Sequence, residues 1–235
     1  MNVQYFSHIG QDQWVSECLH HKRKGFFLDF GAFDGKTISN TYFLEKELEW
    51  NGICVEPNPF FYSQLCGSRN CTLINSALWP ISRQSLQFCD AHGLSSIVEF
   101  RDCDVNAERR KEATKTLIEV DTINPTELLR RFDAPTLIDY LSLDVEGCEY
   151  EVLEAIDLTT YHIALMTIEH NHVTAKRDKI RKYLTNNRYE YVQNRNEDWF
   201  FNLEYISKAV GSSGNKIVNP VEIFTMIYKT YAINE

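Results

Sequence analysis

The chain has 235 residues, of which 43% are apolar and 24% are charged, a composition typical of globular proteins that excludes collagen-like and wholly disordered classes. Its 33 acidic residues outnumber 24 Lys and Arg and leave a net charge of −9, which repels a nucleic acid backbone, so no nucleic acid partner is expected. The length suits one folding unit, and we predict a single domain over residues 1–235.

The chain contains no run of the ~18 apolar residues that a membrane span needs, and polar residues rather than a signal-peptide core follow Met1. These features predict a cytoplasmic protein without a membrane span. The cysteines are seven in number and include no C-x-x-C pair, so we expect reduced thiols rather than a disulfide framework or a Cys-rich zinc site.

Predicted strands and helices alternate along the chain, which is typical of a mostly parallel sheet with helices on both faces. Residues 1–24 are expected to form a helical cap before the first strand. Apolar runs predict strands at 26–30, 52–55, 71–75, 85–89, 116–120, 138–143 and 163–168, and a closing antiparallel hairpin at 189–203. Helical spacing is present at 37–50, 60–68 and 174–187, and a short helix begins at 124.

Two segments do not fit this alternation. Apolar residues are sparse in 101–115, which predicts a mobile loop or a surface helix. Residues 207–219 include a Gly-Ser-Ser-Gly-Asn stretch and are predicted to be a second mobile loop.

Four of the predicted strands end in acidic turns, at 29–35, 56–58, 144–147 and 169–171. A single acid at such a place is commonly only a helix cap. Because ligands of open parallel sheets bind beyond the carboxyl ends of the strands, four acidic turns at one edge indicate a shared site.

The first two turns indicate the ligand. Gly31 and Gly35 would allow a tight turn, and Glu56 follows Gly35 by 21 residues, where a carboxylate can accept hydrogen bonds from a ribose. The spacing is not G-x-G-x-x-G, and Asp29 and Asp34 place negative charge where a dinucleotide needs its pyrophosphate. A cationic nucleoside without phosphate, S-adenosylmethionine, fits this turn better than NAD.

At this point the chain resembles a known family, the FkbM family of S-adenosylmethionine-dependent O-methyltransferases. The similar segments occur in order at 5–12, 27–35, 39–41, 50–57 and 139–147. The resemblance implies a Rossmann-like class I methyltransferase fold and methyl transfer to a hydroxyl, here predicted on a sugar or glycan acceptor. It leaves 101–115 and the residues after about 195 unexplained.

Cofactor contacts are predicted along the acidic edge. We assign Asp29 and Gly31 to the methionine end, Asp34 and Gly35 to the turn, Ser39 and Asn40 to the cofactor carboxylate, Glu56 to the ribose, and Asn75, Ser76 and Ala77 to the adenine. Helix capping is the alternative for Ser39 and Asn40. The acceptor is predicted to contact Gln11, Asp12, Glu146 and Asn171, and capping of the first helix is the alternative for Gln11 and Asp12.

A sugar hydroxyl needs a base or a metal ion before it can attack a methyl group. His170 is the predicted base, with Asp144 and Glu169 beside it. The alternative is Mg²⁺ held by Asp144, Glu169 and Asn171, since these supply the oxygen ligands that Mg²⁺ prefers. A nicotinamide-dependent oxidoreductase and a non-catalytic Rossmann-like scaffold are the competing functions.

Overall fold

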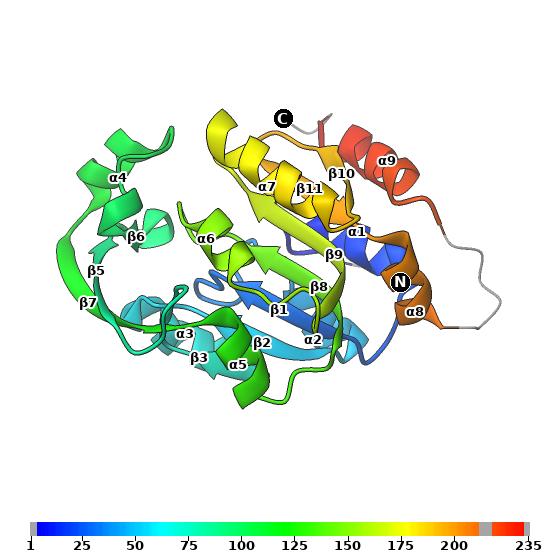
Figure 1. Cartoon of the computed structure of the whole chain (residues 1–235), viewed down its shortest axis with the longest axis horizontal. Helices are drawn as coiled ribbons and strands as arrows, with labels where there is room; N and C mark the ends of the chain where they lie inside the picture. The colour runs from blue at the N-terminus through cyan, green and yellow to red at the C-terminus, as the bar shows by residue number, and fades with distance from the viewer. Residues whose placement is uncertain (1–3, 212–217, 233–235) are drawn as a thin grey trace.

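A computed structural model describes residues 4–211 and 218–232 (Figure 1). Its centre is a seven-stranded sheet of order β10-β11-β9-β8-β1-β2-β3. The strands are β1 (Phe26–Phe30), β2 (Asn51–Val55), β3 (Thr72–Ile74), β8 (Leu137–Leu143), β9 (His162–Glu169), β10 (Glu190–Gln193) and β11 (Glu197–Phe201). All neighbouring pairs from β9 to β3 are parallel, whereas β11 is antiparallel to both β9 and β10. The predicted α/β architecture, a mostly parallel sheet with a closing antiparallel hairpin, is confirmed.

From β1 the chain runs outward to one edge of the sheet through β2 and β3, and the later strands extend from β8 toward the other edge. β2 flanks β1 on one side and β8 on the other, so the direction of winding reverses between them. Such a reversal opens a crevice at the carboxyl ends of the strands, where α/β proteins bind ligands.

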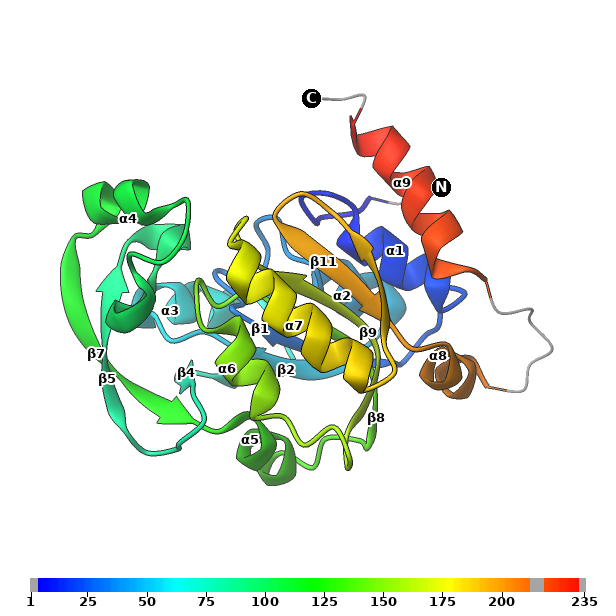
Figure 2. The same cartoon turned by 45° about the horizontal axis from the view of Figure 1, so that its top comes forward.

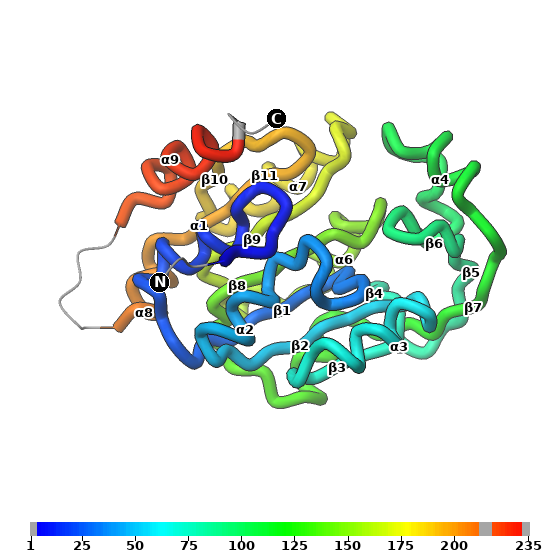
Figure 3. The backbone as a smooth tube through the Cα atoms, turned by 180° about the vertical axis from the view of Figure 1, so that it is seen from behind, coloured from blue at the N-terminus to red at the C-terminus, as the bar shows by residue number. Residues whose placement is uncertain are grey.

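Helices cover both faces of this sheet because its strands bury side chains on both sides. In β1, Leu28 and Phe30 belong to one hydrophobic cluster and Phe27 to the other. The first cluster is covered by α5 (Pro125–Arg131), α6 (Glu149–Glu154) and α7 (Thr174–Asn186) (Figure 2). The second is covered by α1 (Gln11–Cys18), α2 (Tyr42–Leu48), α3 (Pro59–Ser68), α8 (Leu203–Val210) and α9 (Pro220–Ala232) (Figure 3).

A second, four-stranded sheet of order β4-β7-β5-β6 lies beyond the carboxyl ends of the central strands (Figure 1). It consists of β4 (Ala77–Leu78), β5 (Ser85–Asp90), β6 (Ser96–Ile97) and β7 (Thr116–Ile123), with the short helices η1 (His92–Leu94), η2 (Val98–Phe100) and α4 (Ala107–Ala113). We call residues 77–123 the flap. The strands predicted at 85–89 and 116–120 therefore exist, but they pair with each other outside the central sheet.

The two segments predicted to be loops have different outcomes. Residues 101–115 contain α4, in agreement with the surface-helix alternative, and its Arg110 is buried. In 207–219, α8 continues to Val210, and residues 212–217 lie outside the described residues. The helix predicted at 37–50 begins only at Tyr42 because the preceding residues form a turn.

Two composition-based expectations can also be compared with the structure. All seven cysteines are free thiols, as predicted. Over 4–211 and 218–232, the helices are all too short or too polar to cross a bilayer.

Candidate active site

A cavity lies at the carboxyl ends of β1, β2 and β8, between these strands and the flap. Of the predicted site residues, its wall includes Asp29, Gly31, Ser39, Asn40, Glu56, Ala77, Asp144 and Glu146. The flap contributes Leu78, Phe88, His92, Gly93, Ser95 and Ile97. Most of the predicted cofactor residues thus meet at one place.

Gly31 brings the three strand ends together. Its backbone has φ +92°, and a Cβ at this position would lie 1.7 Å from the carbonyl oxygen of Asp144. Its N–H donates to the carbonyl of Val55 at 3.0 Å. Only glycine permits this contact between the turn after β1 and the end of β8.

Asp29 lines the cavity but already has partners within the protein. Its carboxylate accepts a hydrogen bond from the Thr41 hydroxyl and lies 3.6 Å from the buried guanidinium of Arg69. Burial raises the pKa of Asp29, and the charge of Arg69 opposes this rise. The positive charge of Arg69 therefore already offsets much of the negative charge with which Asp29 was expected to attract a cationic cofactor.

Asp34 and Gly35 shape the turn rather than the cavity wall. Asp34 accepts hydrogen bonds from the backbone N–H groups of Lys36 and Thr37 at 2.8 and 2.7 Å. Its pKa is lowered, because these bonds and that of the Thr37 hydroxyl outweigh the opposing effect of burial. Gly35 has φ +78°, and a Cβ there would lie 2.5 Å from Leu65 of α3.

The same loop carries Ser39 and Asn40 into the cavity wall. The Ser39 hydroxyl accepts the N–H of Tyr42 at 3.1 Å at the start of α2, which fits the capping alternative. The Asn40 amide donates to the Ser142 hydroxyl at 2.9 Å and so links this loop to β8.

Glu56 ends β2 with its carboxylate at the cavity. It accepts the backbone N–H groups of Phe33 and Asn58 at 2.9 and 2.8 Å. Burial raises the pKa of Glu56 to about 8 against the effect of these hydrogen bonds, and the charges of Asp29 and Asp144 add to the rise. A ligand that donates hydrogen bonds here would bind the ionised form more tightly.

Of the three residues predicted to contact adenine, only Ala77 lines the cavity. Asn75 is exposed, and its amide donates to the carbonyls of Glu56 and Pro57 at 2.8 and 3.0 Å. Asn75 thus holds the turn that presents Glu56. Ser76, between Asn75 and Ala77 in the sequence, does not line the cavity.

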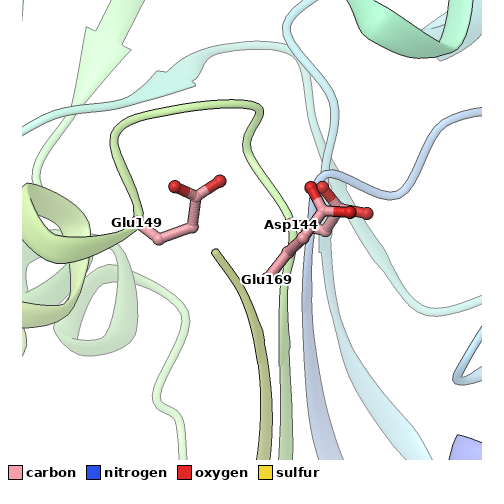
Figure 4. Close-up of side chains that lie close together, drawn as sticks. All are labelled: Asp144, Glu149 and Glu169. Atoms are coloured by element: carbon pink, nitrogen blue, oxygen red, sulfur yellow. The ribbon is translucent and has the colours of Figure 1, made fainter. Parts of the chain in front are cut away.

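A group of carboxylates occupies the ends of β8 and β9. Asp144 and Glu169 lie against each other (Figure 4), and an oxygen of each and one of Glu149 lie within 4.8 Å of one another. The Asp144 side chain is exposed to the cavity, yet loss of water among the surrounding protein atoms raises its pKa. Burial, followed by the charge of Asp144, raises the pKa of Glu169 well above its usual range. Such a pair holds a proton readily.

Amides and one ammonium group hold this acidic group in place. Glu169 accepts hydrogen bonds from the amides of Asn171 and Asn196 at 2.6 and 2.8 Å. Glu149, which the sequence analysis did not select, accepts the ammonium of Lys176 at 2.6 Å. The Asn171 amide turns its nitrogen, a hydrogen-bond donor, toward the carboxylates. The residues that could hold a metal ion are therefore Asp144, Glu149 and Glu169, in place of the predicted Asp144, Glu169 and Asn171.

His170 lies outside the cavity wall, in contrast to its predicted position beside the acceptor. Its ring is 2% exposed and its Nε2 lies 3.8 Å from Asp198 of β11. Burial lowers the pKa of His170 to about 4, so the ring is neutral at pH 7. Successive residues of an extended chain point to opposite faces, and this separates His170 from Glu169.

Gln11 and Asp12 also lie outside the cavity wall. Asp12 accepts the backbone N–H groups of Phe6 and Ser7 at 2.7 and 3.2 Å, and the Gln11 amide donates to Glu197 of β11 at 3.1 Å. Both residues anchor the N-terminal segment at the start of α1.

Comparison with known families identifies the protein class. A family model described as Methyltransferase FkbM domain matches residues 29–191, from Asp29 of β1 to β10. The chain belongs to the FkbM methyltransferase family. The matched range contains the cavity and the whole flap, and it favours methyl transfer over nicotinamide chemistry.

Solved structures resemble the FkbM chain only distantly. Methyltransferase FkbM from Methylobacillus flagellatus KT shares 13% identity with a TM-score of 0.47, and the match covers 76% of this chain and 43% of that one. The precorrin-6y C5,15-methyltransferase of Geobacter metallireducens GS-15 shares 12% identity with a TM-score of 0.44, covering 80% and 84%. The FkbM chain thus spans less than half the length of the Methylobacillus protein. No curated protein matches it by sequence.

Methyltransferases use S-adenosylmethionine as a rule, and the cavity of this FkbM protein suits that cofactor. The acidic residues of its wall are Glu56 and Asp144, which have no ion-pair partner among the described residues, and Asp29 and Glu146, which pair with Arg69 and Arg110 from outside the wall. Within the described residues the wall contains neither Lys nor Arg. Such a wall attracts a cationic sulfonium and repels phosphate. The residues present therefore fit the cofactor.

Several FkbM site residues were not apparent from the sequence. Lys176 and Arg110 hold the carboxylates Glu149 and Glu146. They come from the predicted helix 174–187 and from 101–115, which was predicted to be a mobile loop or a surface helix. Their only sequence signal is a basic residue within an amphipathic helix, which is also typical of an exposed helix face.

Proposed function

We propose that this FkbM protein transfers a methyl group from S-adenosylmethionine to a hydroxyl of a sugar acceptor. One observation carries the proposal: Glu56 and Asp144, neither of which has an ion-pair partner among the described residues, line the same cavity, at the ends of the two parallel strands β2 and β8 that flank β1. A carboxylate suited to ribose hydroxyls and a carboxylate suited to an attacking hydroxyl thus lie in one site.

Cofactor binding is assigned to the part of the cavity that follows β1 and β2. Glu56 accepts hydrogen bonds from the ribose hydroxyls, and Gly31 allows the backbone to approach the ligand closely. Asn40 and Ser39 would face the methionine end, and Ala77 would pack beside the adenine. The cofactor supplies a methyl group that is activated by its positive sulfonium.

Proton removal is assigned to Asp144. Asp144 would accept the hydroxyl proton while the acceptor oxygen bonds to the methyl carbon, the carbon–sulfur bond breaks and the sulfur leaves as a neutral thioether. Glu169 lies against Asp144 (Figure 4) and shares the proton. Much of the rate enhancement of such a displacement comes from alignment of the acceptor oxygen. Because His170 lies outside the wall, its predicted role as the base finds no support in the geometry.

Magnesium assistance is the alternative mechanism. Asp144, Glu149 and Glu169 supply the hard oxygen ligands that Mg²⁺ prefers, and these residues would hold the ion. The ammonium of Lys176 on Glu149 opposes this arrangement. EDTA treatment decides between the mechanisms: full activity in excess EDTA supports Asp144 as an unaided base, whereas loss restored by Mg²⁺ supports the metal.

The test of the function has two steps. Titration calorimetry measures binding of S-adenosylmethionine and NAD, and mass spectrometry then follows methyl transfer to neutral hexosides and 6-deoxyhexosides. Cofactor binding with a gain of one methylene on a sugar supports the proposal. Binding of NAD alone would refute it, and cofactor binding without transfer to any sugar would refute the sugar acceptor.

A matched pair of variants tests the role of Asp144. Asp144→Asn should retain cofactor binding and lose turnover, because an amide does not accept the proton. Asp178→Asn, on the exposed surface of α7, should behave like the unmodified protein.

A further inference from the structure

The flap contains a buried cation close to the carboxylates of the site. Arg110 of α4 is 1% exposed. Its guanidinium donates to the carbonyls of Leu94 and Arg101, both at 2.7 Å, and to both carboxylate oxygens of Asp104 at 3.1 and 2.9 Å. Arg110 therefore has enough partners within the flap to be fixed there.

Arg110 also reaches out of the flap to the turn between β8 and α6. Its Nη2 lies 2.8 Å from Oε2 of Glu146. The same oxygen accepts the Asn171 amide at 3.4 Å. No group in residues 4–211 or 218–232 donates a hydrogen bond to Oε1 of Glu146, and Glu146 lines the cavity. One oxygen is thus held by the protein, and the other is available to a ligand.

The backbone of this turn is strained and is held by contact with the flap. Glu146 has φ +54°, a left-handed conformation that costs a non-glycine residue about 1–2 kcal/mol. The next residue, Gly147, has φ +136°, and a Cβ there would lie 2.5 Å from Phe100 of η2. Strain of this kind persists only where the surroundings impose it, and it concentrates at functional sites.

We propose that Arg110 is a positioning residue, which holds Glu146 so that its Oε1 accepts a hydrogen bond from a second sugar hydroxyl next to the one that is methylated. This inference rests on the proposed function and narrows its acceptor to sugars with two neighbouring free hydroxyls. Asp144 and Glu146 are two residues apart and line the same cavity, as recognition of such a diol requires. The segment 101–115, which the family resemblance left unexplained, thereby gains a role.

A purely structural role for Arg110 is the competing explanation, since the residue also joins the flap to the sheet. The two roles differ in a double-mutant cycle. If Arg110 acts on the acceptor through Glu146, the double variant should be no worse than Glu146→Gln alone. If Arg110 only stabilises the flap, the two losses should add.

The experiment uses the full chain as Arg110→Gln, Arg110→Lys, Glu146→Gln and the double variant, with exposed Arg109→Gln as the matched control. Two probes are compared: the hexoside with the highest turnover, and its analogue that lacks the neighbouring hydroxyl. Loss of one charged hydrogen bond should raise the acceptor KM about tenfold or more in Arg110→Gln and Glu146→Gln. The cofactor Kd should stay within about twofold of its original value, and Arg110→Lys should recover part of the affinity.

The deoxy analogue separates recognition from folding. Its KM should be the same in the unmodified protein and in Glu146→Gln, a comparison that holds even if Arg110→Gln fails to fold. Additive losses, an equal effect on both probes, or a parallel change in cofactor Kd would overturn the inference while leaving the methyltransferase function intact. An unmodified protein that binds cofactor but methylates no sugar would overturn the proposed acceptor and this inference with it.

Discussion

The cavity has two parts, the proposed cofactor half after β1 and β2 and the proposed acceptor half after β8 and β9. These halves hold their carboxylates by different means. After β2, Glu56 is held by backbone N–H groups of nearby turns, as is Asp34 in the turn beside the cavity. Asp29 of β1 is the exception in this half, because the side chains of Thr41 and Arg69 hold it. After β8 and β9, the carboxylates are held by side chains from other elements, such as Arg110 of α4 and Lys176 of α7.

This difference has a physical consequence. A backbone cradle forms whenever the turn forms, so the cofactor half depends on the glycines and turn residues that set the fold. A side-chain cradle depends on particular distant residues, so the acceptor half can change its recognition without changing the fold. Substitutions should therefore have different effects in the two halves.

The largest effect is expected at the turn that joins the halves. Gly31→Ala places a Cβ 1.7 Å from the Asp144 carbonyl oxygen, and we expect a loss of unfolding free energy on the order of 4 kcal/mol together with loss of cofactor binding. Gly67→Ala in α3 is the control, because a Cβ there has no atom within 4 Å. It should stabilise the protein by about 0.5–1 kcal/mol in urea denaturation. Equal effects of both changes would contradict the role of Gly31.

The side-chain cradle can be broken at Lys176. This residue is 9% exposed and pairs with fully buried Glu149 at 2.6 Å. Lys176→Met leaves Glu149 without its cation and should lower the unfolding free energy by about 3 kcal/mol. Lys182→Met, on the exposed part of the same helix, should change it by less than about 0.5 kcal/mol. A small effect at Lys176 would show that this half does not depend on its distant partners.

Removing the charge of Glu56 tests the cofactor half. Glu56→Gln should weaken S-adenosylmethionine binding by roughly 1–3 kcal/mol, or about ten- to a hundredfold, through loss of charged hydrogen bonds. The fold should survive, which thermal unfolding measures alongside calorimetry. Exposed Glu47→Gln serves as the control. An unchanged Kd in Glu56→Gln would refute the ribose assignment.

The pH dependence of cofactor binding sharpens the test of Glu56. The pKa of Glu56 is raised to about 8 by burial, with the charges of Asp29 and Asp144 contributing. If the cofactor binds only the ionised form, its affinity should fall about tenfold for each pH unit below 8. Glu56→Gln should flatten this dependence between pH 6 and 8. Burial also raises the pKa of Glu146 to about 8, but Glu146→Gln should leave the dependence unchanged.

The same raised pKa has the opposite effect on stability. Folded Glu56 keeps a proton that the unfolded chain releases near pH 4.3, so the unfolding free energy should fall as pH rises from about 5 to 8. Glu56→Gln should reduce this fall. A steeper fall in the variant would contradict the assigned shift.

Sequence patterns predicted the central sheet, and they selected most of the residues that line the cavity after β1 and β2, because both depend on local features. Apolar runs mark buried strands, and Gly31 and Glu56 stand at strand ends where the connectivity of a parallel sheet brings them together. The same reasoning assigned Asp34 to the turn, which its hydrogen bonds to Lys36 and Thr37 fit. It placed Asn75 at the adenine but missed that Asn75 holds the turn before Glu56, because sequence position does not show where a side chain points.

The acceptor half could not be predicted in this way. His170 lies next to Glu169 in sequence but faces β11, and Arg110 lies 36 residues from Glu146 but touches it. By itself, the sequence determined the fold class, the sheet edge at which the cavity lies and the family, since periodicity and turn chemistry act over a few residues. Only the tertiary structure decided which side chains hold the acceptor carboxylates, because that depends on how the flap and α7 pack against the strand ends.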